Sequence, residues 1–281
     1  MAKTALITGT SSGFGLLTSI TLAQRGWHVI ATMRDLGRRE QLDSAAQSAR
    51  VQDRIEIRAL DVTNSDQIAS LAAEIGTRPA PLDALVNNAG FAIAGFADDV
   101  TDAELRLQFE TNFFGAAAVT RAFLPQFRRQ GMGHIVMVSS ISGRVGFPGV
   151  SSYAASKFAL EGWAETLRFE LKALGINVVI VEPGSFETDI WTRNAKISAR
   201  MQDPASPNAS RIAAWRTRME NAEKRGNPQL VADTVASILE NPKPKLRYPV
   251  GRDARFGVLM QRFLPSRLFE RLVIRGSCID K

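Results

Sequence analysis

The chain has 281 residues, 45% of them hydrophobic and 22% charged, and this composition excludes extensive disorder. No run of about 18 apolar residues occurs, so a membrane-spanning helix is not expected. The single cysteine, Cys278, excludes an intramolecular disulfide and a cysteine-based zinc site. Because no signal peptide is visible either, we expect a reducing, cytoplasmic location.

The formal charge of +7 is unevenly distributed along the chain. Residues 1–190 hold 17 basic and 20 acidic side chains, whereas residues 191–281 hold 18 basic and 8 acidic ones. The basicity therefore belongs to the last third, where no long run of lysine or arginine occurs. This distribution argues against a dedicated nucleic-acid binder.

Short apolar runs alternate with helical patterns from the N-terminus onwards. The expected strands are Thr4–Thr8, His28–Thr32, Ile55–Leu60, Ala84–Val86, His134–Ser140, Val178–Glu182 and Arg247–Pro249. The expected helices are Phe14–Arg25, Leu36–Ala49, Ser65–Ile75, Asp102–Arg129, Tyr153–Leu174, Ile212–Lys224 and Gln229–Glu240. The strands lack strict alternation of polar and apolar residues, which is typical of parallel strands covered on both faces. We therefore predict one α/β domain over residues 1–281, with a doubly wound parallel sheet of about seven strands and helices on both faces.

The predicted domain has three parts, of which residues 1–185 form the core. Residues 186–228 interrupt the alternating pattern and contain Pro204, Pro207 and Pro228. A long irregular segment at the ligand-binding edge of a sheet predicts a substrate lid, the alternative being a surface loop without a task. Residues 229–281 hold the last helix, the last strand and a basic helical extension. We expect this extension to pack on its own domain or on a partner subunit, the alternative being a membrane-surface or nucleic-acid contact.

The first expected strand runs into a glycine-rich turn, Thr8-Gly9-Thr10-Ser11-Ser12-Gly13-Phe14-Gly15, and a helix follows at once. Glycines permit a tight turn and a close approach of backbone N–H groups to a diphosphate, and the helix N-terminus adds its dipole. The spacing G-x-x-x-G-x-G between strand and helix therefore predicts a dinucleotide-binding turn. The alternative is a purely structural turn.

The end of the second expected strand bears on the choice of dinucleotide. Met33 stands where an acidic side chain would bind a ribose 2′-hydroxyl, and Arg34 follows it. Because a guanidinium forms strong hydrogen bonds with a phosphate, this pattern favours NADP over NAD. NAD would be favoured if the Asp35 carboxylate faced the ribose.

A reactive constellation is expected further along the chain. Tyr153 and Lys157 lie four residues apart on one helical face, and an ammonium near a phenol lowers the pKa of the phenol. Ser140 ends an expected strand at the ligand edge, while its neighbour Ser139 should point elsewhere. Asn112 lies in an otherwise apolar helix, where a buried amide needs hydrogen-bond partners.

Together these motifs occur in the order found in one family. Thr8–Gly15, Asp61, Asn87-Asn88-Ala89-Gly90, Asn112, Ser140, Tyr153 with Lys157, and Pro183-Gly184 follow one another. Over about residues 3–190 the sequence strongly resembles the short-chain dehydrogenase/reductase family, which has a Rossmann fold. The resemblance implies that Tyr153 is the catalytic acid/base and that Lys157 binds the nicotinamide ribose and lowers the Tyr153 pKa. It also implies that Ser140 orients the substrate oxygen and that Asn112 holds a water in a proton relay.

The resemblance also implies a set of cofactor-binding residues in the core. They are Gly9, Ser11, Ser12, Gly13, Phe14, Gly15, Arg34, Asp61, Val62, Asn88, Ala89, Gly90, Tyr153, Lys157, Pro183, Gly184, Phe186 and Thr188. Asp61 would contact the adenine, and Thr188 would reach the nicotinamide amide. No metal site is expected.

The expected activity is NADP(H)-dependent interconversion of an alcohol and a ketone or aldehyde. The segment Ala31–Leu36 and the basic, aromatic C-terminal region resemble the branch that contains type 1 17β-hydroxysteroid dehydrogenase and the retinol dehydrogenases. That branch implies a bulky apolar substrate, although smaller carbonyl compounds stay open. The expected substrate-contacting residues are Ser140, Phe147, Tyr153, Phe186 and Trp191. The family implies a homodimer or homotetramer, and a noncatalytic NADP-binding sensor is the alternative function.

Overall fold

The computed structural model of the chain describes residues 2–188, 195–220 and 226–277, and its centre is a seven-stranded parallel sheet. The strand order is β3-β2-β1-β4-β6-β7-β9. The strands are β1 (Thr4–Thr8), β2 (His28–Met33), β3 (Ile55–Ala59), β4 (Ala84–Asn87), β6 (Gly133–Val138), β7 (Ile176–Pro183) and β9 (Arg247–Val250). This sheet confirms the predicted doubly wound α/β fold, with the order reversing between β1 and β4.

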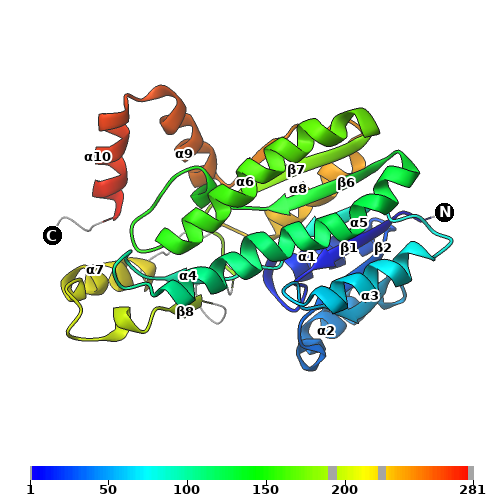
Figure 1. Cartoon of the computed structure of the whole chain (residues 1–281), viewed down its shortest axis with the longest axis horizontal. Coiled ribbons are helices and arrows are strands. Elements are labelled where there is room, and N and C mark those ends of the chain that lie inside the picture. The colour runs from blue at the N-terminus through cyan, green and yellow to red at the C-terminus, as the bar shows by residue number, and fades with distance from the viewer. Residues whose placement is uncertain (1, 189–194, 221–225, 278–281) are drawn as a thin grey trace.

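Helices cover both faces of the sheet (Figure 1). The helices of one face are α1 (Gly13–Gln24), α2 (Glu40–Ser48) and α8 (Gln229–Glu240), and those of the other are α3 (Ser65–Gly76), α5 (Ala116–Gln130) and α6 (Ser151–Leu171). Neighbouring residues of a strand enter opposite cores: Ile7 packs with the α1 side and Leu6 with the α3 side, both fully buried. Because both faces are apolar, the strands show no alternation of polar and apolar residues.

The predicted helix Asp102–Arg129 is interrupted in the structure. It consists of α4 (Asp102–Phe109), a π-helical turn (Glu110–Gly115) and α5. Thr101 and Glu104 form a capping box that starts α4. π-Helical turns occur frequently at functional sites, and this one carries Asn112. Sequence periodicity did not predict it, because a π-helical turn of six residues is too short to show a period of its own.

The sequence also failed to predict a second, two-stranded parallel sheet. It pairs β5 (Ala92–Ala94) with β8 (Ala195–Ile197), a strand inside the expected lid. Three-residue strands leave almost no periodic pattern, so they were not predicted. The segment continues through a short 3₁₀ turn to α7 (Ala209–Glu220), and Asn208, just before α7, donates hydrogen bonds to Asp98 and Asp99. These bonds attach the described part of the segment to the loop before α4.

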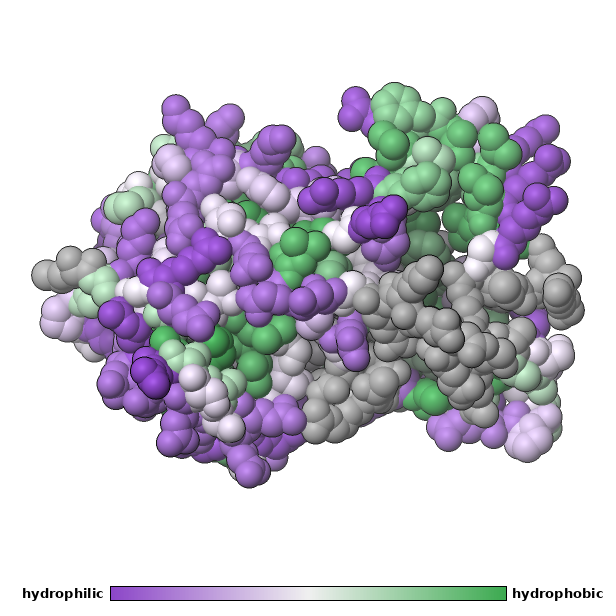
Figure 2. Space-filling view, turned by 180° about the vertical axis from the view of Figure 1, so that it is seen from behind, coloured by the Kyte–Doolittle hydropathy of each residue, from purple (hydrophilic) through white to green (hydrophobic). Residues whose placement is uncertain are grey.

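The basic extension forms α9 (Arg252–Phe263) and α10 (Ser266–Ser277). Gln261 of α9 donates to the Arg144 carbonyl oxygen (2.7 Å), and the Asp253 carboxylate accepts from Ser185 N (2.6 Å). Exposed apolar side chains gather on both helices (Figure 2): Phe256, Leu259, Phe263, Leu268 and Leu272. No helix within the described residues is long and apolar enough to cross a membrane.

Candidate active site

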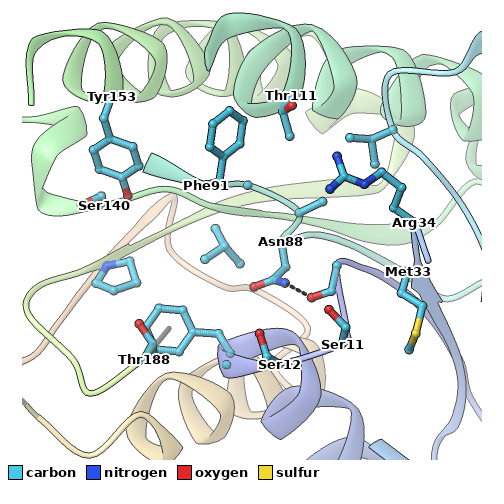
Figure 3. Close-up of a pocket in the computed structure, with 18 of the residues that line it drawn as sticks. Ser11, Ser12, Met33, Arg34, Asn88, Phe91, Thr111, Ser140, Tyr153 and Thr188 are labelled. Carbon is cyan, nitrogen blue, oxygen red and sulfur yellow. Dashed lines mark hydrogen bonds between the residues drawn. The ribbon is translucent and has the colours of Figure 1, made fainter. Parts of the chain in front are cut away.

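The glycine-rich turn joins β1 to α1 and is held by the end of β4. Gly9 has φ +72°, and a Cβ there would lie 2.7 Å from Ala89 Cα, so glycine is required by both conformation and space. The Asn88 side chain donates to the carbonyl oxygens of Thr8 (2.9 Å) and Gly9 (2.8 Å), and the latter bond is visible in Figure 3. A Cβ at Gly15 would collide with the Gly9 carbonyl oxygen. These contacts between protein groups fix the conformation of the glycine-rich turn.

The residues after β2 and β3 lie at the same end of the site. Met33 is buried, whereas Arg34 is exposed and lines the cavity. The Asp35 carboxylate accepts a hydrogen bond from Gly37 N at 2.9 Å, which caps the short turn Leu36–Arg38. Asp61 similarly accepts from Thr63 N at 2.9 Å. One oxygen of the Asp35 carboxylate is thus hydrogen-bonded within its own turn, and Asp35 lines the cavity next to Arg34.

Ser140, Tyr153 and Lys157 come together at the opposite end (Figure 3 shows the first two). Strand β6 ends at Val138, so Ser140 lies just beyond the strand and starts a 3₁₀ turn, accepting from Ser142 N at 3.1 Å. A hydrogen bond links the side chains of Ser140 and Tyr153. Lys157 Nζ donates to the Val138 carbonyl oxygen at 2.9 Å and lies 5.7 Å from the centroid of the Tyr153 ring.

The pKa values of these groups are governed first by burial. Burial raises the pKa of Tyr153 to about 12, with the hydrogen bond to Ser140 opposing the shift. Burial lowers the pKa of Lys157 to about 8, and the charge of Glu161 opposes this shift. Burial therefore opposes the lowering of the Tyr153 pKa by Lys157 that the family resemblance implies, and this lowering stays a prediction.

Asn112 is buried beside this site and does not line the cavity. Its side-chain oxygen accepts from Phe91 N, and its nitrogen donates to the Phe91 carbonyl oxygen and to Ser156 Oγ, each at 3.1 Å. The π-helical turn is thereby attached to the segment after β4 and to α6. Its role in a water relay stays a prediction.

One cavity of about 500 Å³ connects the two ends of the site. The predicted residues that line it are Gly9, Ser11, Ser12, Gly13, Phe14, Arg34, Asp61, Val62, Asn88, Ala89, Gly90, Ser140, Tyr153, Lys157, Pro183, Gly184, Phe186 and Thr188. Gly15 lies behind the turn, and Phe147 packs beside Tyr153 without lining the cavity. Trp191 lies outside the described residues. The site residues that the sequence did not predict include Leu107, Thr111 and Lys196. They come from α4, the π-helical turn and β8, whose positions no linear motif marks.

The cavity has the features that a dinucleotide requires. Thr188 Oγ1 is buried and, among the described residues, has no hydrogen-bond partner. A buried hydroxyl of this kind needs a partner, and a ligand amide in the cavity would provide one. The glycine turn leaves backbone N–H groups at the N-terminus of α1, where a diphosphate binds well. Within the described ranges, no group of three or more His, Cys, Asp or Glu side chains could hold a metal ion.

Fold and cavity together define a dinucleotide-dependent oxidoreductase, and comparison with known proteins gives its family. Residues 3–198 match the family model described as short chain dehydrogenase. The chain therefore belongs to the short-chain dehydrogenase/reductase family, as the order of its motifs predicted. It is an NAD(P)-dependent oxidoreductase.

Relatives and solved structures extend this match over the rest of the chain. The chain is 42% identical to "Uncharacterized oxidoreductase YusZ" of Bacillus subtilis over 277 residues, covering 96% of this chain and 97% of the relative. It is 35% identical to human "Retinol dehydrogenase 8" over 256 residues, covering 87% of this chain and 80% of the relative. A short-chain dehydrogenase structure from Streptomyces avermitilis superposes with a TM-score of 0.82 at 36% identity, covering 98% of both chains. Other solved neighbours contain NADP or NADPH, with TM-scores of 0.72, 0.76 and 0.73.

Proposed function

We propose that this protein interconverts an alcohol and a ketone or aldehyde with NADP(H), and that Tyr153 exchanges the proton with the substrate oxygen. The main support for this proposal is that one cavity has the glycine-rich turn at one end and Ser140, Tyr153 and Lys157 at the other. This arrangement suits an extended cofactor whose reactive end meets a proton donor.

Each side chain has a role that its contacts support. The nicotinamide cofactor supplies or accepts the hydride when it is bound. With a pKa of about 12, Tyr153 is protonated at neutral pH and can give its proton to a developing alkoxide. The Ser140 hydroxyl, which is hydrogen-bonded to Tyr153, orients the substrate oxygen. The Lys157 ammonium is held by the Val138 carbonyl oxygen within reach of a cofactor ribose.

The preference for NADP over NAD rests on Arg34 and Asp35. Arg34 lines the cavity at the end of β2 and is available to a 2′-phosphate. Asp35, whose carboxylate would favour NAD if it faced a ribose, also lines the cavity, and one of its carboxylate oxygens accepts a hydrogen bond from Gly37 N. Solved neighbours with NADP(H) support the same preference.

The proposed substrate is bulky and apolar. Phe91, Leu107 and Phe186 give the cavity apolar walls, and an apolar substrate gains free energy by leaving water there. The similarity to retinol dehydrogenase 8 supports this class.

The test is a screen of the purified protein with NADPH and NADH against ketones and aldehydes graded by size and polarity. Tyr153→Phe should lower kcat by about 10²- to 10⁴-fold and leave NADPH affinity nearly unchanged, because only the proton transfer is lost. Arg34→Ala should weaken NADPH binding about tenfold or more without affecting NADH binding. NADPH binding without hydride transfer to any compound of the panel would overturn the proposal in favour of a noncatalytic sensor.

A further inference from the structure

Three consecutive residues, the last of β6 and the two that follow it, each bind one residue of α6. The three residues of α6 follow one another at intervals of one helical turn. The Val138 carbonyl oxygen accepts from Lys157 Nζ, the Ser139 hydroxyl donates to Glu161 Oε1 at 2.7 Å, and Ser140 is bonded to Tyr153. The spacing of Tyr153, Lys157 and Glu161 places all three on the same face of α6. Two of these three attachments belong to the candidate active site, and the third ends on a carboxylate that the proposed reaction does not use.

Glu161 belongs to a charge cluster with buried carboxylates, by which we mean Glu161, Glu182 and Arg247, whose side chain is 23% exposed. We call it the buried charge cluster. Glu161 is 2% exposed and Glu182 is fully buried. Arg247 Nη1 donates to Glu182 Oε1 at 2.8 Å and also pairs with Glu161. On the outer side, Arg247 Nη2 donates to Glu165 at 2.9 Å, and Arg144 lies 3.4 Å from Glu182.

Burying the carboxylates of this cluster costs desolvation free energy. Within the described residues Glu182 Oε2 has no hydrogen-bond partner, so two buried carboxylates share one closely placed guanidinium. Well-packed apolar residues of similar volume are often at least as stable as a buried ion pair. Stability alone therefore does not account for a carboxylate at position 161, one helical turn from Lys157.

We propose that Glu161 is a positioning residue for the Lys157 ammonium, resting on the function proposed above. Its carboxylate, held by Ser139 and Arg247, keeps Lys157 charged in a buried site and fixes α6 against the end of β6. Glu161 does not line the cavity, so it would act through Lys157, which lies one helical turn away on the same face of α6.

The charges around Glu161 support this role. Glu161 interacts with Lys157 of α6, Glu182 of β7 and Arg247 of β9. The further charges of the group are Glu165 of α6, which pairs with Arg247, and Arg144, which pairs with Glu182. Burial, together with the charge of Glu182, raises the pKa of Glu161 to about 7. Burial lowers the pKa of Lys157 to about 8, and the negative charge of Glu161 opposes this shift. Its charge extends the range over which the ammonium persists.

The test compares the pH profiles of four proteins on the best substrate of the carbonyl panel. In Glu161→Gln the alkaline limb of kcat should move to lower pH by about one unit, because the buried ammonium loses its stabilising charge. The pH at which NADPH affinity declines should move with it, which reports on Lys157 without requiring turnover. Glu161→Asp keeps the negative charge, so the alkaline limb of its kcat profile should stay at the wild-type pH even if kcat falls.

Glu165→Gln is the matched control, because Glu165 lies one turn further along α6 and also pairs with Arg247, but is 45% exposed. Its limb should coincide with the wild-type limb. If Glu161→Gln does not fold, Ser139→Ala should move the limb in the same direction by a smaller amount. Unmoved limbs in these variants, or an equal shift in Glu165→Gln, would overturn the inference. Wild-type protein without Tyr153-dependent turnover would instead overturn the proposed function, and the NADPH profile would still test Glu161.

Discussion

Two glutamate–arginine clusters in this protein contain the same residue types in opposite surroundings. The surface charge cluster consists of Glu56, Arg58, Glu74 and Arg78, whose side chains are 26–43% exposed. There the hydrogen bond from Arg78 lowers the pKa of Glu56 to about 2. In the buried charge cluster, burial and the charge of Glu182 raise the pKa of Glu161 to about 7 although Arg247 is paired with it. Burial and a neighbouring like charge therefore outweigh a guanidinium partner in setting the sign of the shift.

The largest expected effect comes from removing the arginine of each cluster. Arg247→Met leaves two buried carboxylates without their shared cation and should lower the free energy of unfolding by about 3–5 kcal/mol. Arg78→Met removes solvated pairs only and should cost about 0–1 kcal/mol. Urea unfolding at pH 7.5 measures both. Similar losses of unfolding free energy in the two variants would show that burial of the carboxylates does not make the Arg247 pairs more important for stability than the Arg78 pairs.

The second effect is on the pH dependence of stability. The folded-state pKa of Glu161 is raised above its unfolded value, so the folded state holds more protons between about pH 4.5 and 7. The contribution of Glu161 to the free energy of unfolding should therefore fall as the pH rises through this window, by on the order of 2 kcal/mol. Glu161→Gln should lack that fall. Urea unfolding at pH 5 and pH 7 checks it, and a wild-type slope that the variant retains would contradict it.

The smallest effect is expected at Glu56, and it has the opposite sign. Its pKa is depressed in the folded state, so its stabilising contribution is present above pH 4.5 and is lost as the pH falls towards 2. Because the pair is partly solvated, the loss should be no more than about 1 kcal/mol. Acid unfolding monitored by circular dichroism should start at higher pH in wild type than in Glu56→Gln once both curves are normalised to their stability at pH 5. Coincident curves would show that the pair contributes nothing measurable.

Much of the candidate site could be predicted from local sequence. Gly9 and Gly13 mark a turn whose positive φ angles only glycine adopts readily, and Tyr153 and Lys157 are related by helical spacing alone. The alternation of side chains predicted that Ser139 points away from Ser140, and its hydroxyl donates to Glu161, a partner that the sequence did not predict. These features depend on residues within a few positions of one another.

The features that could not be predicted depend on distant segments. Arg247 is 86 residues from Glu161, and no motif connects them. The pairing of β5 with β8 and the hydrogen bonds of Asn112 to Phe91 are likewise nonlocal. The sequence also shows the neighbouring ammonium of Lys157 but does not show how completely the Tyr153 phenol is buried.

The sequence by itself determined the parallel sheet, the glycine-rich turn at its edge, and the chemical groups that meet there. Apolar runs, left-handed glycine positions and helical spacing are local properties, and each chain segment carries them before folding. The tertiary structure alone decided how strongly those groups are desolvated and which distant charges face them. Since desolvation depends on all the atoms that exclude water from a group, the protonation of Tyr153, Lys157 and Glu161 is a property of the packed fold.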